Sequence, residues 1–220
     1  MQVSCVLRNS LWLAAVCLCA QEKPVTAVNP ADIPRMRPRA SANDYQAHAR
    51  AGSVSIGAEF MRHAVPTPQG EFSTEDYVVV EAGLFGPAGE KAKLSTQDFS
   101  LRVNGKKAVP GQPFGVVLSN LKDPSWQPPE APKPKGGGLS TGGGEGGNPG
   151  DPPPAPPKMP LPLVHIMQIK VEKASMPEGD RALPEAGLLF FAYRGVGDKI
   201  KSVELMYSGP AGKATLTLQP

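Results

Sequence analysis

Apolar and polar residues alternate with a period of two in two separate blocks of the chain. The alternation is clearest over residues 53–60 and 99–104, and residues 77–85 form an almost continuous apolar run. Alternation predicts half-buried strands, and the apolar run predicts a central strand. Asn104-Gly105 predicts a hairpin turn with its return strand over 106–109, because both residues tolerate a positive φ.

The same pattern resumes in the last quarter of the chain. Strands are expected there over 163–171, 188–193, 200–207 and 214–218. One more strand is expected earlier, over 115–119, at the end of the first block. Seven to nine short strands separated by glycine and proline turns favour a β-sandwich or barrel.

One short helix is expected before the first strand. Asn43 is a suitable N-cap, residues 44–51 contain good helix formers, and Gly52 can close the helix in a left-handed conformation. No long helical pattern separates the strands, so a parallel α/β sheet is not expected.

The composition changes sharply between the two blocks of strands. Thirteen of the chain's 26 prolines lie between residues 123 and 162, together with a glycine-rich run. Such a segment buries too little apolar surface to offset the entropy of ordering it. The predicted organisation is a signal peptide (1–20), a flexible basic arm (21–42), the first part of a β-sandwich (43–122), a disordered insertion (123–161) and the second part of the same sandwich (162–220).

The N-terminus has the order of features found in a secretory signal. Arg8 precedes the apolar stretch 11–18, and Ala20 precedes a polar residue. The stretch is shorter than the roughly 20 residues that span a bilayer, and no later segment resembles a membrane span. Cleavage near Ala20 would make the protein secreted or periplasmic.

The cysteines all lie in this leader, as Cys5, Cys17 and Cys19. Cleavage after Ala20 therefore leaves no thiol for a disulfide, a nucleophile or a metal site. Cleavage just before Cys17 or Cys19 would instead create a lipid anchor. That alternative is disfavoured, because Val16 and Leu18 are larger than such sites prefer.

Four stretches carry a family resemblance: 76–81, 98–105, 187–191 and 199–205. They resemble the telokin-like, immunoglobulin-fold domains of unknown function found on exported bacterial proteins. The turn at 86–89 and the Pro/Gly-rich insertion depart from that family's pattern. The resemblance implies an immunoglobulin-like antiparallel β-sandwich and no chemistry, since a fold does not specify a function.

Nucleophilic catalysis finds no support in the residue pattern. The histidines are His48, His63 and His165, and no serine lies in a Gly-x-Ser-x-Gly turn. Ser202 and Ser208 flank a predicted strand and have no partner in the sequence.

The sequence offers candidate residues for two other chemistries. Glu75, Asp76 and Glu81 are close enough in sequence to suggest a carboxylate pair, but a strand would place Asp76 on the opposite face, which favours solvated charges. On a strand, His165 and Met167 would share a face, a donor pair suited to copper; Met61 and His63 repeat the spacing in reverse. No dense cluster of such donors accompanies them.

No catalytic, cofactor-binding or metal-ligating residue is therefore assigned. The chain has 23 basic and 20 acidic residues, and losing Arg8 with the leader leaves 22 basic residues and a net charge of +2. That balance is too small to predict nucleic-acid binding. The sequence predicts a non-enzymatic binding or structural module of the cell envelope, whose partner is an envelope or extracellular protein or polymer. The alternative is a periplasmic small-ligand or copper carrier.

Overall fold

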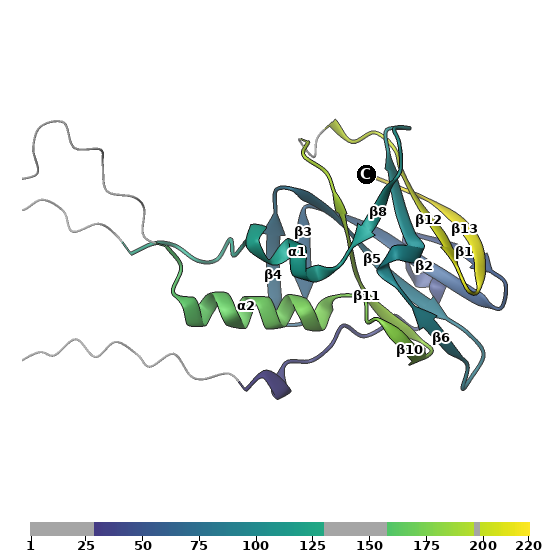
Figure 1. The fold of residues 1–220 in the computed structure, drawn as a ribbon, viewed down its shortest axis with the longest axis horizontal. Helices are drawn as coiled ribbons and strands as arrows, with labels where there is room; N and C mark the ends of the chain where they lie inside the picture. The colour runs from purple at the N-terminus through teal and green to yellow at the C-terminus, as the bar shows by residue number, and fades with distance from the viewer. Residues whose placement is uncertain (1–28, 130–157, 196–198) are drawn as a thin grey trace, which may run out of the picture.

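The computed structural model describes residues 29–129, 158–195 and 199–220 (Figure 1). The predicted leader, the start of the arm and most of the predicted insertion lie outside these residues.

Antiparallel strands dominate the described residues. One eight-stranded sheet has the order β1-β2-β5-β11-β8-β7-β12-β13, and its pairs are all antiparallel. Its strands are β1 (Ala47–Ala51), β2 (Val54–Arg62), β5 (Tyr77–Phe85), β7 (Phe99–Val103), β8 (Val109–Gln112), β11 (Glu185–Ala192), β12 (Val203–Gly209) and β13 (Gly212–Leu218).

Two small sheets and short helices flank the large sheet. The small sheets are β3 (Ala64–Thr67), β4 (Gly70–Thr74) and β9 (Leu121–Lys122), and β6 (Lys91–Leu94) with β10 (Gly179–Ala182). The helices are η1 (Pro30–Asp32), η2 (Ala42–Asp44), η3 (Thr96–Asp98), α1 (Phe114–Val117), η4 (Leu118–Asn120) and α2 (Leu161–Ala174).

The large sheet curls until its two outermost strands, β1 and β13, lie next to each other. A side chain rather than a strand ladder joins them. Gln46 Nε2 donates to the Gln219 carbonyl oxygen at 3.2 Å, and the Gln219 N–H donates to Gln46 Oε1 at 3.1 Å. The mainly antiparallel β class is confirmed by this architecture, whereas the immunoglobulin-like sandwich stays a prediction.

The core has two compartments separated by the central strands. Val78, Val80 and Phe191 point into the interior of the curled sheet, where residues from both blocks of strands meet. Val79 and Phe190 point outward and are covered by α2 and the β3-β4-β9 sheet. Burial on both faces explains the continuous apolar run, and it confirms that residues 77–85 form a central strand.

The helix expected over 43–52 is wrong. Only the turn η2 forms there, with the Ser41 N–H donating to Asp44 Oδ2 at 2.8 Å, and residues 47–51 are strand β1. Ala47, Ala49 and Ala51 alternate with His48 and Arg50, so the segment also has the period of a strand. Its alanines pack on the interior core, and that tertiary contact overrides helix propensity.

The strand expected over 163–171 is also wrong, because this segment belongs to helix α2. Pro162 lies in the first turn, where proline fits a helix, and Met167, Val171 and Ala174 are buried at helical spacing. The helix carries apolar residues on more than one face, and their spacing over 163–171 also happens to fit the period of a strand. Residues 115–119, expected as a strand, form α1 and η4 instead.

The hairpin prediction at Asn104-Gly105 is confirmed. Both residues have positive φ, 53° and 67°, and the Lys106 N–H donates to the Val103 carbonyl at 3.1 Å. The return strand β8 begins at Val109, three residues later than expected.

The described part of the predicted flexible basic arm packs against the body. Ile33 is buried, and the Met36 N–H donates to the Lys173 carbonyl at 3.3 Å. Arg39 forms ion pairs with Glu59 and Glu81. Its guanidinium also lies 4.4 Å from the centre of the Tyr45 ring, a cation–π contact.

A substitution at Gly187 on β11 can test how closely Met176, which follows α2, packs against the sheet. An added Cβ would lie 2.4 Å from the backbone N and Cα of Met176. Gly187→Ala is expected to lower the free energy of unfolding in urea by about 1–3 kcal/mol, because backbone must shift. The matched control is Gly115→Ala, where nothing lies within 4 Å of the added Cβ. Equal effects of the two substitutions would contradict this packing.

Two buried tyrosines predict an alkaline loss of stability. Burial raises the pKa of Tyr45 and of Tyr207 above the ordinary value of 10.0. The unfolded chain releases these protons first, so stability falls as the pH rises through and above about 10. The double variant Tyr45→Phe, Tyr207→Phe is expected to show a shallower decline in urea denaturation between about pH 8 and 11. A decline as steep as that of the wild type would contradict the prediction.

Candidate functional site

The three histidines lie in separate parts of the fold: on β1, on α2 and, for His63, in the turn between β2 and β3. His48 is exposed on β1, and His165 is exposed on α2. His63 Nδ1 lies 2.7 Å from the Tyr77 carbonyl oxygen, an acceptor, so this nitrogen carries the proton. Within the described part of the chain, no hydrogen bond joins a histidine to a serine or a carboxylate.

The three candidate carboxylates each have a different cationic partner. Glu75 pairs with Lys122, Asp76 lies 3.4 Å from Arg194, and Glu81 lies 3.2 Å from Arg39. The structure therefore does not bring these carboxylates together around one reacting position.

The copper interpretation of His165 and Met167 is wrong. It required a strand, but residues two apart on a helix point in nearly opposite directions. Met167 is buried in the outer compartment of the core, and His165 faces solvent. Met61 packs against the same compartment, while His63 bonds to the Tyr77 carbonyl. The described residues contain no group of three His, Cys, Asp or Glu side chains placed to hold a metal ion.

The feature that sequence reasoning missed is a cavity at one end of the curled sheet, here called the mouth cavity. Its volume is about 570 Å³. Four elements form it: the end of β7, the β7–β8 hairpin tip, the start of β8 and the segment that follows β11. Its described lining consists of Leu101, Val103, Asn104, Lys106, Lys107, Val109, Ala192, Tyr193, Arg194, Gly195 and Lys199.

The floor of the mouth cavity is apolar because it is the end of the interior core. Leu101 and Val103 belong to that core compartment, and Val109 and Tyr193 pack against it. Strand β8 is paired with β7 and with β11 over only two residues each, so the hairpin tip extends beyond the sheet. The space between the tip and the end of β11 is the cavity.

Asn104 fixes the geometry of the hairpin tip. Its Nδ2 donates to the Lys199 carbonyl at 2.9 Å, and its Oδ1 accepts from the Lys201 N–H at 2.6 Å and the Ser202 N–H at 3.2 Å. This residue therefore ties the segment before β12 to the turn, and it holds Lys106 and Lys199 on the same rim.

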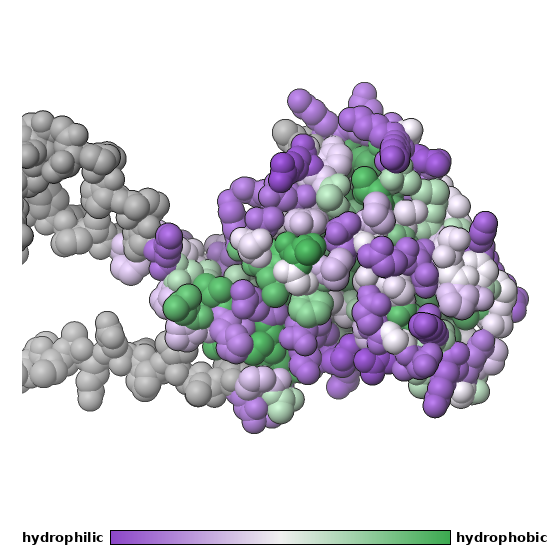
Figure 2. Space-filling view, viewed as in Figure 1, coloured by the Kyte–Doolittle hydropathy of each residue, from purple (hydrophilic) through white to green (hydrophobic). Residues whose placement is uncertain are grey.

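The rim carries charge of one sign. Lys106, Lys107, Arg194 and Lys199 line the described part of the cavity, which includes no acidic side chain. Arg194 forms the exposed ion pair with Asp76, and the three lysines are in no ion pair among the described residues. At the top of Figure 2, hydrophilic side chains surround a hydrophobic patch, where Figure 1 places the hairpin tip and the end of β11. Lys106-Lys107 beside a hairpin turn was a sequence signal, but only the strand order places β11 next to it.

The comparisons with known proteins do not identify a family. No protein-family model and no curated protein matches the chain. Among solved structures, a crystal structure described as a "putative lipoprotein (ycdA)" from Bacillus subtilis matches with 10% sequence identity and a TM-score of 0.35. The match covers 80% of this chain but only 39% of that one, and a similarity this weak carries no argument about function.

No helix in the described residues is long and apolar enough to cross a bilayer.

The ion pairs of Arg39 with Glu59 and Glu81 yield a prediction about the repulsion between these two carboxylates. Glu59 and Glu81 lie opposite each other on β2 and β5, Arg39 pairs with both, and the Glu81 side chain is only 12% exposed. Arg39→Ala is expected to lower the free energy of unfolding by about 1–3 kcal/mol, between the effects seen for exposed and buried pairs. Adding Glu59→Gln should restore part of the lost free energy of unfolding, because it removes the charge repulsion between Glu59 and Glu81. Urea denaturation measures the stability of the single and the double variant. If the double variant is no more stable than Arg39→Ala, a charge-based role for Arg39 is contradicted.

Proposed function

We propose that this protein is an exported, non-enzymatic binding module whose mouth cavity takes an anionic ligand with an apolar portion. The apolar portion would lie on Leu101, Val103 and Val109, and the anionic group would lie among the rim cations. The juxtaposition of this floor and this rim is the observation that carries the proposal.

Size supports the mouth cavity over the other cavities. Small-molecule sites usually enclose roughly 300–1,000 Å³. The mouth cavity, at about 570 Å³, lies within that range, whereas two further cavities have volumes of about 240 and 280 Å³. The proposal unites the binding-module and small-ligand-carrier interpretations of the sequence, without copper.

Charge supports an anionic ligand. The lysines at the rim are held on one side of the cavity by the hairpin and by the Asn104 contacts. Like charges gathered at an opening repel one another, and an anion between them relieves that repulsion. Such a site needs no catalytic group, which agrees with the separation of the candidate residues.

Laurate, a twelve-carbon carboxylate, is a suitable probe for isothermal titration calorimetry. Its methyl ester and dodecyltrimethylammonium keep the chain length but remove or reverse the charge. The wild type is expected to bind laurate in preference to both. The triple variant Lys106→Gln, Lys107→Gln, Lys199→Gln is expected to bind laurate at least tenfold more weakly, and added salt should weaken wild-type binding.

The matched control removes the same charge elsewhere. Lys91→Gln, Lys93→Gln, Lys213→Gln replaces three exposed lysines outside the mouth cavity. Its laurate affinity is expected to stay within about twofold of the wild type, since screening limits distant charges. Equal losses in the two triple variants, or no binding of laurate to the wild type, would overturn the proposal.

A further inference from the structure

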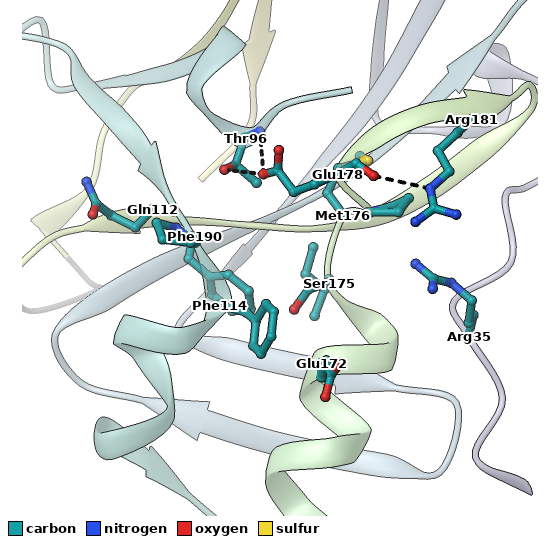
Figure 3. A pocket seen from close by; sticks show the side chains of 13 residues that line it. Arg35, Thr96, Gln112, Phe114, Glu172, Ser175, Met176, Glu178, Arg181 and Phe190 are labelled. Carbon is teal, nitrogen blue, oxygen red and sulfur yellow. Dashed lines mark hydrogen bonds between the residues drawn. The ribbon is translucent and has the colours of Figure 1, made fainter. Parts of the chain in front are cut away.

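A second cavity lies at the other side of the sheet, between the arm, the end of α2 and the edge of β11, and is here called the arm cleft. Its volume is about 240 Å³. Figure 3 shows its lining, with Arg35 from the arm, Arg181 from β10, Phe114 from α1 and Glu172 from α2. It shares no residue with the described lining of the mouth cavity.

The arm cleft exists because β11 is only partly covered along one edge. Strand β8 pairs with it only at Phe190 and Phe191, and Ser175 forms a single bridge with Leu188. The Met176 N–H donates to the Leu188 carbonyl at 3.0 Å. The cleft lies between these two contacts, and the half-buried ring of Phe114 forms an apolar wall.

Two arginines converge on one side of the arm cleft. The side chains of Arg35 and Arg181 extend toward each other in Figure 3, although they come from elements far apart in the sequence. Arg181 Nε donates to the Glu178 carbonyl at 3.3 Å. Neither guanidinium belongs to an ion pair among residues 29–129, 158–195 and 199–220. Two facing cations repel each other, and a bridging anion removes that cost.

The acidic side chains of the cleft are directed elsewhere. Glu178 Oε1 accepts hydrogen bonds from the Thr96 N–H at 3.0 Å and from Thr96 Oγ1 at 2.7 Å. These bonds hold its carboxylate against η3, on the far side from the arginines. Glu172 lies in the last turn of α2, across Ser175 from Arg181. Among the described residues, therefore, no carboxylate lies between the two guanidinium groups.

We infer that the arm cleft binds a small organic carboxylate, with its carboxylate between Arg35 and Arg181 and its apolar part against Phe114. The planar guanidinium matches a carboxylate with two parallel hydrogen bonds, and two arginines can hold both oxygen atoms. The volume of about 240 Å³ lies below the roughly 300–1,000 Å³ usual for drug-sized ligands, so the cleft admits only a smaller molecule. The Phe114 wall favours an apolar body over a bare ion.

Binding would also tie the arm to the body. Arg35 lies next to Met36, whose N–H bonds to the Lys173 carbonyl at the end of α2. An anion shared with Arg181 adds a second attachment between the arm and β10. Hydrogen exchange at residues 33–37 is therefore expected to slow when the carboxylate is bound.

3-Phenylpropionate is the probe for titration calorimetry, with 3-phenylpropanol as its neutral analogue and inorganic phosphate as a bare oxyanion. The wild type is expected to bind 3-phenylpropionate in preference to both. Arg35→Gln and Arg181→Gln are each expected to weaken binding at least tenfold and to abolish the slowing of exchange in the arm. Phe114→Ala should weaken binding of 3-phenylpropionate but not of acetate.

Arg37→Gln is the matched control, because Arg37 is an exposed arginine on the same arm outside the cleft. It should bind like the wild type, and thermal melts of all variants report whether they fold. Unchanged affinity in Arg35→Gln and Arg181→Gln would overturn the inference, as would tighter binding of phosphate. The inference is independent of the proposed function: loss of 3-phenylpropionate binding in the Lys106, Lys107, Lys199 triple variant would instead assign the binding to the mouth cavity.

Discussion

The pairing of β5 with β11 is the constraint on which the rest of the structure depends. Eight consecutive residue pairs join residues 77–84 to 185–192, from opposite sides of the Pro/Gly-rich stretch. Both strands are buried on both faces, so this pairing shapes the interior core and the outer compartment beneath α2. The mouth cavity lies beyond one end of β11, and the arm cleft lies along its free edge.

The sequence predicted the parts of this arrangement that depend on local pattern. Alternation identified strands such as β2 and β7, the apolar run identified β5, and Asn104-Gly105 identified the hairpin. Residues 47–51 and 161–174 were misassigned because their patterns fit two periods. The alanine-rich segment suits a helix or a strand, and the apolar residues of α2 fit both periods, so only the packing of each segment decides between the two.

The candidate sites were not predictable in the same way. Their charged residues were visible in the sequence, but the strand order brings Lys107 to Arg194. The packing of the arm against the end of α2 brings Arg35 to Arg181. The residues that the sequence offered as candidates for copper binding or carboxylate catalysis have structural roles or ion-pair partners instead. Met167 fills the core, and Glu75, Asp76 and Glu81 each lie beside a basic side chain.

The contact between β1 and β13 has a consequence for how the molecule behaves among others. An open sheet presents two rows of unpaired backbone groups that invite strands from neighbouring chains, the first step of edge-to-edge aggregation. Here the two outermost strands lie next to each other, and the Gln46 side chain hydrogen-bonds to the Gln219 backbone as a peptide group of a neighbouring strand would. The curled sheet thus shields its own margins from edge-to-edge association with other copies of the chain.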